Sequence, residues 1–93
     1  MIVDKQKFTE LYDSIKEENE RDLKDEPKLM RSSRVEKLLD INPSTRKRLV
    51  TSGRLKSVKT GETMQSAMRI TKDSVLHLIS IWQTQAEYED FIK

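Results

Sequence analysis

A run of hydroxyl and cationic side chains directly after Pro43 has the composition of a surface that binds an anionic polymer. Arginine can bridge O6 and N7 of guanine, and lysine is a less directional donor. Serine or threonine at a helix start can bind phosphate together with free backbone amides. A second group of cations follows in a segment with strand-like spacing. The first group is Ser44, Thr45, Arg46, Lys47 and Arg48, and the second is Lys56, Lys59 and Arg69. We predict that both groups contact DNA, the alternatives being a solvated face for the first and edge protection of a sheet for the second.

The formal net charge of +2 conceals a strong segregation of charge along the 93 residues. Residues 31–61 contain nine Lys and Arg and two Asp and Glu, which gives a net charge of +7. Residues 1–30 carry −3 and residues 62–93 carry −2. A basic middle segment between acidic ones is typical of a phosphate-binding face on a small domain. A solvated charged surface would have the same composition.

The composition argues against catalysis and against cofactor binding. The chain has no Cys and a single His, so neither a thiolate site nor a His-rich metal site is expected. Two Gly cannot supply a phosphate-binding loop or a dinucleotide fingerprint. The carboxylates of residues 17–26 alternate with Lys and Arg and lack the apolar surroundings that general acid-base catalysis requires. We therefore expect a protein that is not an enzyme and uses no cofactor, metal or small-molecule substrate.

The sequence also predicts the compartment. No apolar run approaches the roughly 18 residues of a membrane span. The first residues, Met1 to Lys5, lack the basic-then-apolar order of a signal peptide. We expect a cytoplasmic protein that associates with DNA and has no membrane partner.

Apolar spacing predicts a helix in the N-terminal part of the chain, beginning near Asp4. Its apolar stripe follows the i, i+3, i+4, i+7 pattern of a buried helix face. Residues 16–26 are almost wholly charged, so the helix either continues as a solvated arm or frays before Pro27. The residues of the stripe are Phe8, Leu11, Tyr12 and Ile15.

A capping box predicts a second, short helix over residues 34–39. In this pattern the hydroxyl of Ser33, or of Ser32, accepts from the amide of Glu36, whose carboxylate reaches back to the cap. Residues 40–43 then break the helix and redirect the chain.

Pro43 suits the first turn of a third helix, because the amide that proline lacks has no intrahelical partner at that position. Asn42 or Ser44 is expected to cap this helix, and Gly53 to end it in the left-handed conformation. Two short helices joined by a tight break make a helix-turn-helix, whose second helix presents its N-terminal residues to the major groove. The first cationic group lies on those N-terminal turns.

After Gly53 the spacing of the apolar residues changes from a helical pattern to the alternation that is typical of β-strands. Alternating apolar residues on either side of Gly61 and Glu62 predict a β-hairpin between about residues 55 and 70. Thr71 or Asp73 then caps a last helix. The predicted core face of that helix contains Val75, Leu78, Ile79 and Trp82.

Short motifs between Ser33 and Trp82 follow one another in the order and spacing of a known family. They are Val35-Glu36-Lys37-Leu38-Leu39 with Ile41, Ser44-Thr45 with Arg48-Leu49-Val50, Ser52-Gly53-Arg54-Leu55 with Val58-Lys59 and Gly61, and Arg69-Ile70 before Asp73. This stretch resembles the winged helix-turn-helix of phage and transposon excisionases, which is related to the DNA-binding domain of MerR regulators. The resemblance implies that the third helix is the recognition helix and that the hairpin is the wing.

Two positions and one segment depart from the family pattern. Position 46 usually holds an apolar residue and here is Arg46, which either contacts DNA or belongs to a differently arranged core. Position 56 is commonly Pro and here is Lys56. The hairpin tip from Gly61 to Ala67 is longer than the minimal wing of the family.

Together these patterns predict a mainly α fold with a small β-hairpin, namely a winged helix-turn-helix (α-α-β-hairpin-α) with an extra N-terminal helix. The predicted domains are an acidic N-terminal arm over residues 1–30 and a DNA-binding domain over residues 31–93. The resemblance implies a recombination directionality factor that binds double-stranded DNA, self-associates on it and helps an integrase excise a mobile element. One alternative is a small transcriptional repressor or a plasmid replication or partition protein. The alternative in another class is a protein-interaction adaptor that uses the N-terminal helix.

Overall fold

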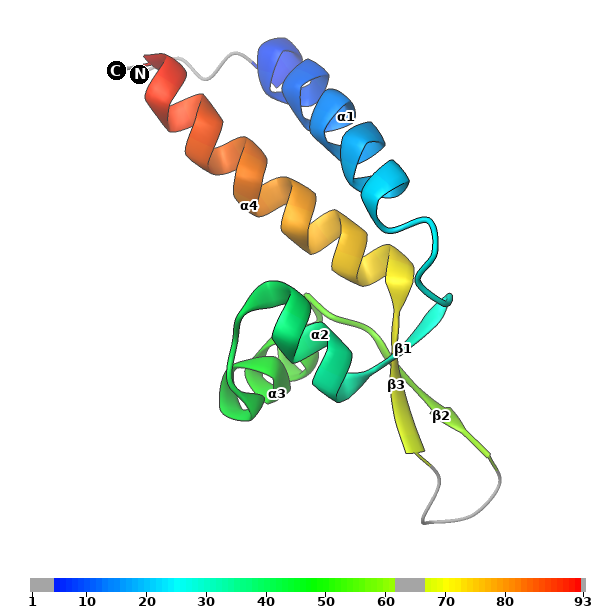
Figure 1. The fold of residues 1–93 in the computed structure, drawn as a ribbon. Coiled ribbons are helices and arrows are strands. Elements are labelled where there is room, and N and C mark those ends of the chain that lie inside the picture. The colour runs from blue at the N-terminus through cyan, green and yellow to red at the C-terminus, as the bar shows by residue number, and fades with distance from the viewer. Residues whose placement is uncertain (1–4, 62–66, 93) are drawn as a thin grey trace. The chain divides into compact units, whose positions relative to one another are not determined.

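The computed structural model describes residues 5–61 and 67–92, which form four helices and a small sheet (Figure 1). The fold is mainly helical with three antiparallel strands, so the predicted fold class is confirmed at this level. Asp4, the predicted start of the first helix, and residues 62–66 of the predicted hairpin tip lie outside the described residues. The elements are α1 (Lys5–Asp22), β1 (Leu29–Arg31), α2 (Ser32–Leu39), α3 (Pro43–Thr51), β2 (Ser57–Thr60), β3 (Ala67–Thr71) and α4 (Lys72–Ile92).

The sheet has the strand order β1-β3-β2, and both pairs are antiparallel. The predicted hairpin is therefore confirmed as β2 and β3, whereas β1 is a third strand that the sequence analysis did not predict. Met30 of β1 lies opposite Ile70 of β3, and both side chains are buried. Because side chains alternate between the two faces of a strand, this row defines the inner face of the sheet.

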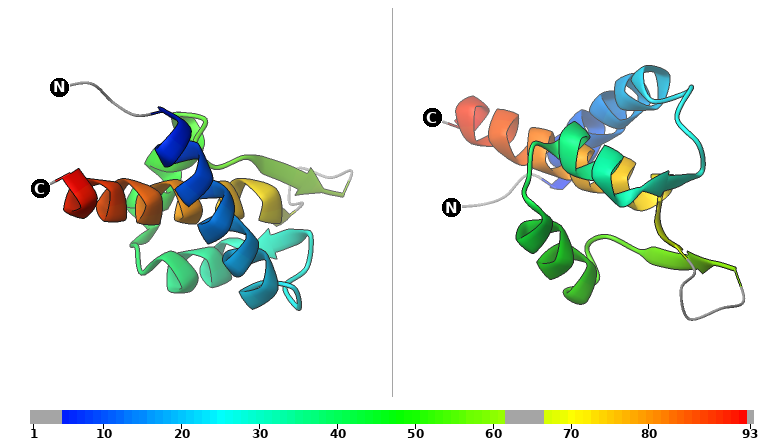
Figure 2. Two further views of the ribbon diagram at one scale, coloured as in Figure 1. Left: turned by 90° about the horizontal axis from the view of Figure 1, so that it is seen from above. Right: turned by 60° about the horizontal axis from the view of Figure 1, so that its bottom comes forward.

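The turn between α2 and α3 follows from three local features. Asp40 ends α2 in the left-handed conformation, with φ 55° and ψ 52°. Asn42 caps α3, and its side chain accepts a hydrogen bond from the Thr45 amide at 2.8 Å. Pro43 occupies the first turn of α3, and Gly53 follows that helix with φ 81°. The predicted break at residues 40–43, the Asn42 cap and the left-handed Gly53 are all confirmed. The change of chain direction between α2 and α3 can be followed in Figure 2.

The predicted capping box of α2 is wrong. The helix begins at Ser32, directly after β1, and its N-cap residue is Arg31, whose side chain makes no capping hydrogen bond. Ser33 is therefore already inside the first turn. The carboxylate of Glu36 instead binds Arg46 of α3. The helix therefore begins two residues earlier than predicted, directly after strand β1, which the sequence did not predict.

The chain forms two compact units. One consists of residues 1–25 and 76–93, and the other of residues 26–75. The predicted domains, 1–30 and 31–93, follow different boundaries, because most of the last helix belongs to the same unit as the first. We call residues 26–75 the basic unit, since it contains twelve Lys and Arg and five Asp and Glu, a net charge of +7. The remaining residues, the acidic unit, contain six Lys and Arg and eleven Asp and Glu, a net charge of −5.

Apolar and aromatic contacts join α1 to α4 within the acidic unit. Ile15 is buried on the predicted stripe, and the other three residues of the stripe are half-buried, so the stripe is confirmed as the packed face of α1. The ring of Phe8 meets that of Tyr88 edge to face, with the centroids 5.5 Å apart.

Polar contacts also join the two helices. The Asn19 side-chain amide donates to the hydroxyl of Ser80 at 3.0 Å and to the side-chain oxygen of Gln83 at 2.7 Å. Ser80 and Thr84 are fully buried, and the Thr84 hydroxyl donates to the Ser80 carbonyl at 2.6 Å. The predicted core face of α4 is thus only partly correct, because Trp82 is half-buried while these small hydroxyl residues are interior.

Candidate nucleic-acid interface

The exposed face of α3 is the centre of the candidate site, and it lies entirely within the basic unit. Ser44, Lys47 and Arg48 are exposed and spaced i, i+3, i+4, so they share one face of the helix. Thr51, at i+7, extends the same exposed stripe. Leu49 is buried and fixes the opposite face of α3 to the interior. The stripe therefore presents hydroxyl and cationic donors to solvent on a rigid element.

Arg46 does not belong to this stripe. Its guanidinium Nε donates to Oε2 of Glu36 on α2. The two side chains are only 17% and 19% exposed, so the ion pair is largely shielded from water. Of the two roles that the sequence left open for this position, the observed contact favours a core arranged around a charged residue. Arg46 ties α3 to α2 and thereby fixes the angle at which the stripe is presented.

Thr45 also faces partly inward. It is half-buried, and its amide donates to the Asn42 side chain, so this amide is occupied by the helix cap. Its hydroxyl lies 3.5 Å from Nη2 of Arg48, at the limit of a hydrogen bond. The expectation that free amides at the start of α3 help to bind phosphate therefore does not extend to the amide of Thr45.

The predicted cations of the hairpin do not share one face of the sheet. Lys59 pairs with Met68, and Arg69 pairs with Val58 in the adjacent row, so the side chains of Lys59 and Arg69 lie on opposite faces. Lys59 is exposed and Arg69 is half-buried. Lys56 directly precedes β2, and its side chain is exposed.

The backbone around Lys56 is fixed by contacts with the strand and helix that follow. The Lys56 carbonyl accepts from the Thr71 amide at 2.9 Å, and the Lys56 amide donates to the Ser74 hydroxyl at 3.1 Å. The Ser74 amide in turn donates to the Thr71 hydroxyl at 3.4 Å, which confirms Thr71 as a cap of α4. Lys56 is therefore held at a fixed place beside the start of α4.

Two further cations of the basic unit are candidate contacts that the sequence analysis did not include. Arg54 is exposed in the loop after α3, where its amide donates to the Leu49 carbonyl at 2.9 Å. It belongs to the Gly-x-Leu motif of the family pattern, and this motif is the signal that pointed to it. Arg31 is exposed on β1, directly opposite Arg69. No sequence signal marked Arg31, because a strand of three residues is too short to show a periodic pattern.

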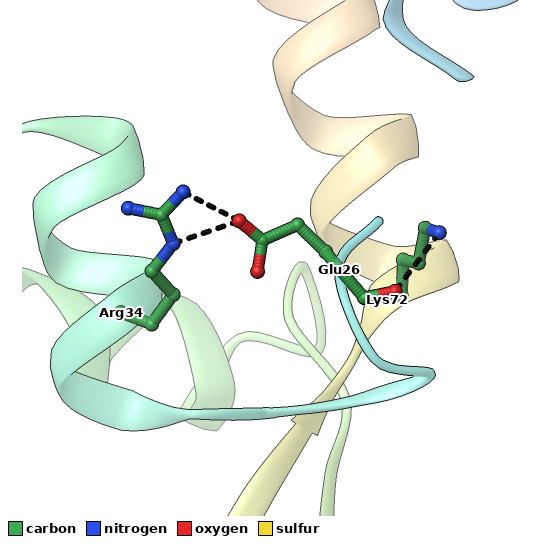
Figure 3. A network of polar contacts seen from close by, with 3 residues as sticks. All are labelled: Glu26, Arg34 and Lys72. Carbon is green, nitrogen blue, oxygen red and sulfur yellow. Dashed lines mark hydrogen bonds and ion pairs between the residues drawn. The ribbon is translucent and has the colours of Figure 1, made fainter. Parts of the chain in front are cut away.

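A network around Glu26 anchors the start of the basic unit (Figure 3). Its carboxylate oxygen Oε1 accepts from Nε and Nη2 of Arg34 on α2, at 2.8 Å and 2.5 Å. The Glu26 carbonyl accepts from Nζ of Lys72 on α4 at 3.1 Å. Glu26 thus links α2 to the first turn of α4 through one residue.

The Glu26 carboxylate raises the pKa of the Arg34 guanidinium above its ordinary value, first by hydrogen bonding and second by charge. Because the pKa is raised in the folded state, the stabilisation that Arg34 provides is complete at every pH below the ordinary arginine value. It is lost only as the pH rises through the raised pKa. Arg34 therefore stays charged at the pH of any ordinary binding assay.

The acidic unit offers contacts of a different kind. Lys7, Glu10, Leu11, Glu87 and Tyr88 line an open pocket of about 450 Å³ between α1 and α4. Within the described part of the chain, no group of three or more His, Cys, Asp and Glu side chains is arranged to hold a metal ion. The helices of the described residues include none with both the length and the apolar character of a membrane span.

Comparison of the chain with protein-family models, with curated proteins and with solved structures finds no match in any of the three.

Proposed function

We propose that this chain is a sequence-specific double-stranded DNA-binding protein of the winged helix-turn-helix type. In this proposal α2 and α3 are the helix-turn-helix, α3 is the recognition helix, and β2 and β3 form the wing. The observation that carries the proposal is the exposed stripe Ser44, Lys47 and Arg48 on the second helix of a tightly turned pair, in a unit with a net charge of +7.

The stripe matches the chemistry of the major groove. That groove is about 12 Å wide and admits an α-helix. Arg48 can bridge O6 and N7 of a guanine, and Lys47 and Ser44 can donate to phosphate or base-edge acceptors. Arg46 supports the stripe from behind through Glu36 instead of contacting DNA. Thr45, which is half-buried and supplies its amide to the helix cap, is also not assigned a DNA contact in this proposal.

The most concrete role is that of an excisionase-like recombination directionality factor, and it rests on the family resemblance of residues 33–82. Such a protein would occupy adjacent sites beside an attachment site, self-associate on DNA and assist an integrase. A repressor or a plasmid replication or partition protein with the same domain would more often bind a palindrome as a stable dimer. Site selection from random DNA separates the two, since tandem sites support the first role and inverted repeats the second.

A binding titration tests the proposal. We expect the wild-type chain to bind random duplex DNA with an affinity that falls steeply between about 50 and 200 mM salt. The double variant Lys47→Ala, Arg48→Ala is expected to lose at least about tenfold in affinity at a selected site. The control is Lys5→Ala, Arg21→Ala, which removes the same charge from exposed positions of α1. It should cost much less affinity than the α3 variant, because it acts only through long-range repulsion and removes no contact. Undetectable wild-type binding at 50 mM salt would overturn the proposal and favour the protein-interaction adaptor.

A further inference from the structure

The outer face of the sheet places two arginines directly opposite each other. Arg31 on β1 pairs with Arg69 on β3, and Arg69 also pairs with Val58 on β2. Residues paired in this way have Cβ atoms about 4.5–5.5 Å apart and project from the same face. The neighbouring row of the sheet holds the buried residues Met30 and Ile70, so the Arg31 row faces away from the core.

In the part of the chain that the structure describes, no acidic side chain pairs with these two arginines. Arg34 and Arg46 of the same unit each bind a glutamate. Among the described residues, neither Arg31 nor Arg69 has an ion pair or hydrogen bond to a side chain. Like charges directly opposite each other destabilise a sheet. A sequence that retains such a pair on an outer face has the arrangement expected when an external anion occupies it.

Apolar side chains flank the two guanidinium groups. Val58 pairs with Arg69, and Leu29 lies two residues before Arg31 on the same face of β1. Leu29 and Val58 are 39% and 40% exposed, which places them among the large apolar residues that the basic unit leaves open to solvent. An alternation of cationic and apolar groups suits a sugar-phosphate strand, where phosphates alternate with apolar faces of deoxyribose. A free phosphate ion would use the cations alone.

We propose that this outer face binds the sugar-phosphate backbone of DNA, with Arg31 and Arg69 as paired phosphate contacts and Leu29 and Val58 against the sugars. The inference rests on the proposed DNA-binding function and deepens it, because it adds strand β1 to the interface. The contact carries no base information. It fixes the position of the sheet on the duplex, as phosphate contacts do in general.

The test measures affinity for duplex DNA as a function of salt with the full chain. Arg31→Gln and Arg69→Gln are each expected to lower the salt slope, d log K/d log[salt], by about 0.9, and the double variant by about twice that. The loss should be the same factor for every duplex sequence. Lys28→Gln removes an equal charge next to β1 but outside the paired rows, and should retain the wild-type slope. Arg31→Lys keeps the charge and should retain most of the slope.

The free protein provides a second readout. Because the arginine pair repels itself, Arg31→Gln should unfold at the same temperature as the wild type or at a higher one. A lower unfolding temperature would make Arg31 a structural residue and overturn the inference. Wild-type binding with unchanged slopes in both single variants would overturn it while leaving the proposed function intact. No binding by the wild type would overturn both, and an equal loss of binding to polyglutamate would reassign the face to an acidic protein.

Discussion

Arg46 and Lys47 are neighbours with the same charge and opposite environments. Arg46 is paired with Glu36 behind α3, whereas Lys47 is exposed on the stripe. We expect Arg46→Ala to lower the free energy of unfolding by about 1–2 kcal/mol, because it leaves a largely shielded carboxylate without its partner. Once corrected for the folded fraction, its DNA affinity should change by less than about twofold. Lys47→Ala should give the reverse result, weaker binding with little change in stability. Chemical denaturation and a DNA titration measure the two quantities.

A double-mutant cycle with Glu36→Ala completes this test. If the ion pair is the source of the stability change, the double variant Glu36→Ala, Arg46→Ala should lose less free energy of unfolding than the two single variants together, by about 1 kcal/mol. Additive losses, or a large loss of DNA affinity in Arg46→Ala, would mean that Arg46 acts outside the pair.

Among the non-glycine residues that the structure describes, Asp40 is the one with a positive φ, which is 55°. This conformation costs an ordinary side chain about 1–2 kcal/mol, and glycine adopts it without that cost. The Ile41 amide donates to the Glu36 carbonyl at 2.9 Å across this residue, so the conformation is part of the cap that ends α2. We expect Asp40→Gly to raise the free energy of unfolding by about 0.5–1 kcal/mol, measured by chemical denaturation.

Asp40→Ala separates conformation from charge. It removes a carboxylate that is unfavourable at the helix C-terminus, but alanine tolerates the left-handed conformation less well than Asp does. Because these two effects oppose each other, Asp40→Ala should stabilise the protein less than Asp40→Gly does. Equal stabilisation by both variants would show that the charge, not the conformation, is costly at this position.

At the scale of elements, the start of α3 depends on one hydrogen bond from the Thr45 amide to the Asn42 side chain. We expect Asn42→Ala to lower the free energy of unfolding by about 1 kcal/mol and Asn42→Ser to retain most of the stability. Since α3 carries the candidate site, Asn42→Ala should also weaken DNA binding. Thermal unfolding of the three proteins is the first measurement. Equal stability of the alanine and serine variants would contradict a role for the cap.

The elements that the sequence predicted well are those with local signals. The break at residues 40–43 and the Asn42 cap depend on residues close together in the chain, and Gly53 has the conformational freedom that its position needs. Strand β1 was missed because its stability comes from pairing with β3, about 40 residues away. The capping box of α2 failed for the same reason, since β1 sets the start of that helix.

In the candidate site, too, the sequence predicted the local features but not the contacts between residues far apart in the chain. The sequence predicted that residues 44–48 act together, but a helix turns by about 100° per residue and divides them between two faces. Ser44, Lys47 and Arg48 remain exposed, whereas Arg46 meets a partner ten residues earlier in the chain. Arg31 came next to Arg69 only through the sheet register, which no short-range pattern encodes.

At the scale of the whole molecule, charge separates by compact unit. Counting along the sequence identified the basic middle, but the fold groups the two acidic ends into one unit of net charge −5. Under the proposed function, the acidic unit would repel the duplex at long range, and this repulsion is screened beyond about 10 Å at 0.1 M salt. The acidic unit should therefore reduce non-specific binding more than it reduces recognition of a selected site.

Neutralising the exposed carboxylates of α1 tests this consequence. We expect the triple variant Glu17→Gln, Glu18→Gln, Glu20→Gln to bind random DNA about twofold to tenfold more tightly than the wild type at 50 mM salt. The gain should vanish near 0.5 M salt, where screening removes the repulsion. The charge-conserving variant Glu17→Asp, Glu18→Asp, Glu20→Asp should bind like the wild type. A gain that persists at high salt would show that these glutamates act through a local contact, and no gain at low salt would show that the acidic unit stays outside the reach of the duplex.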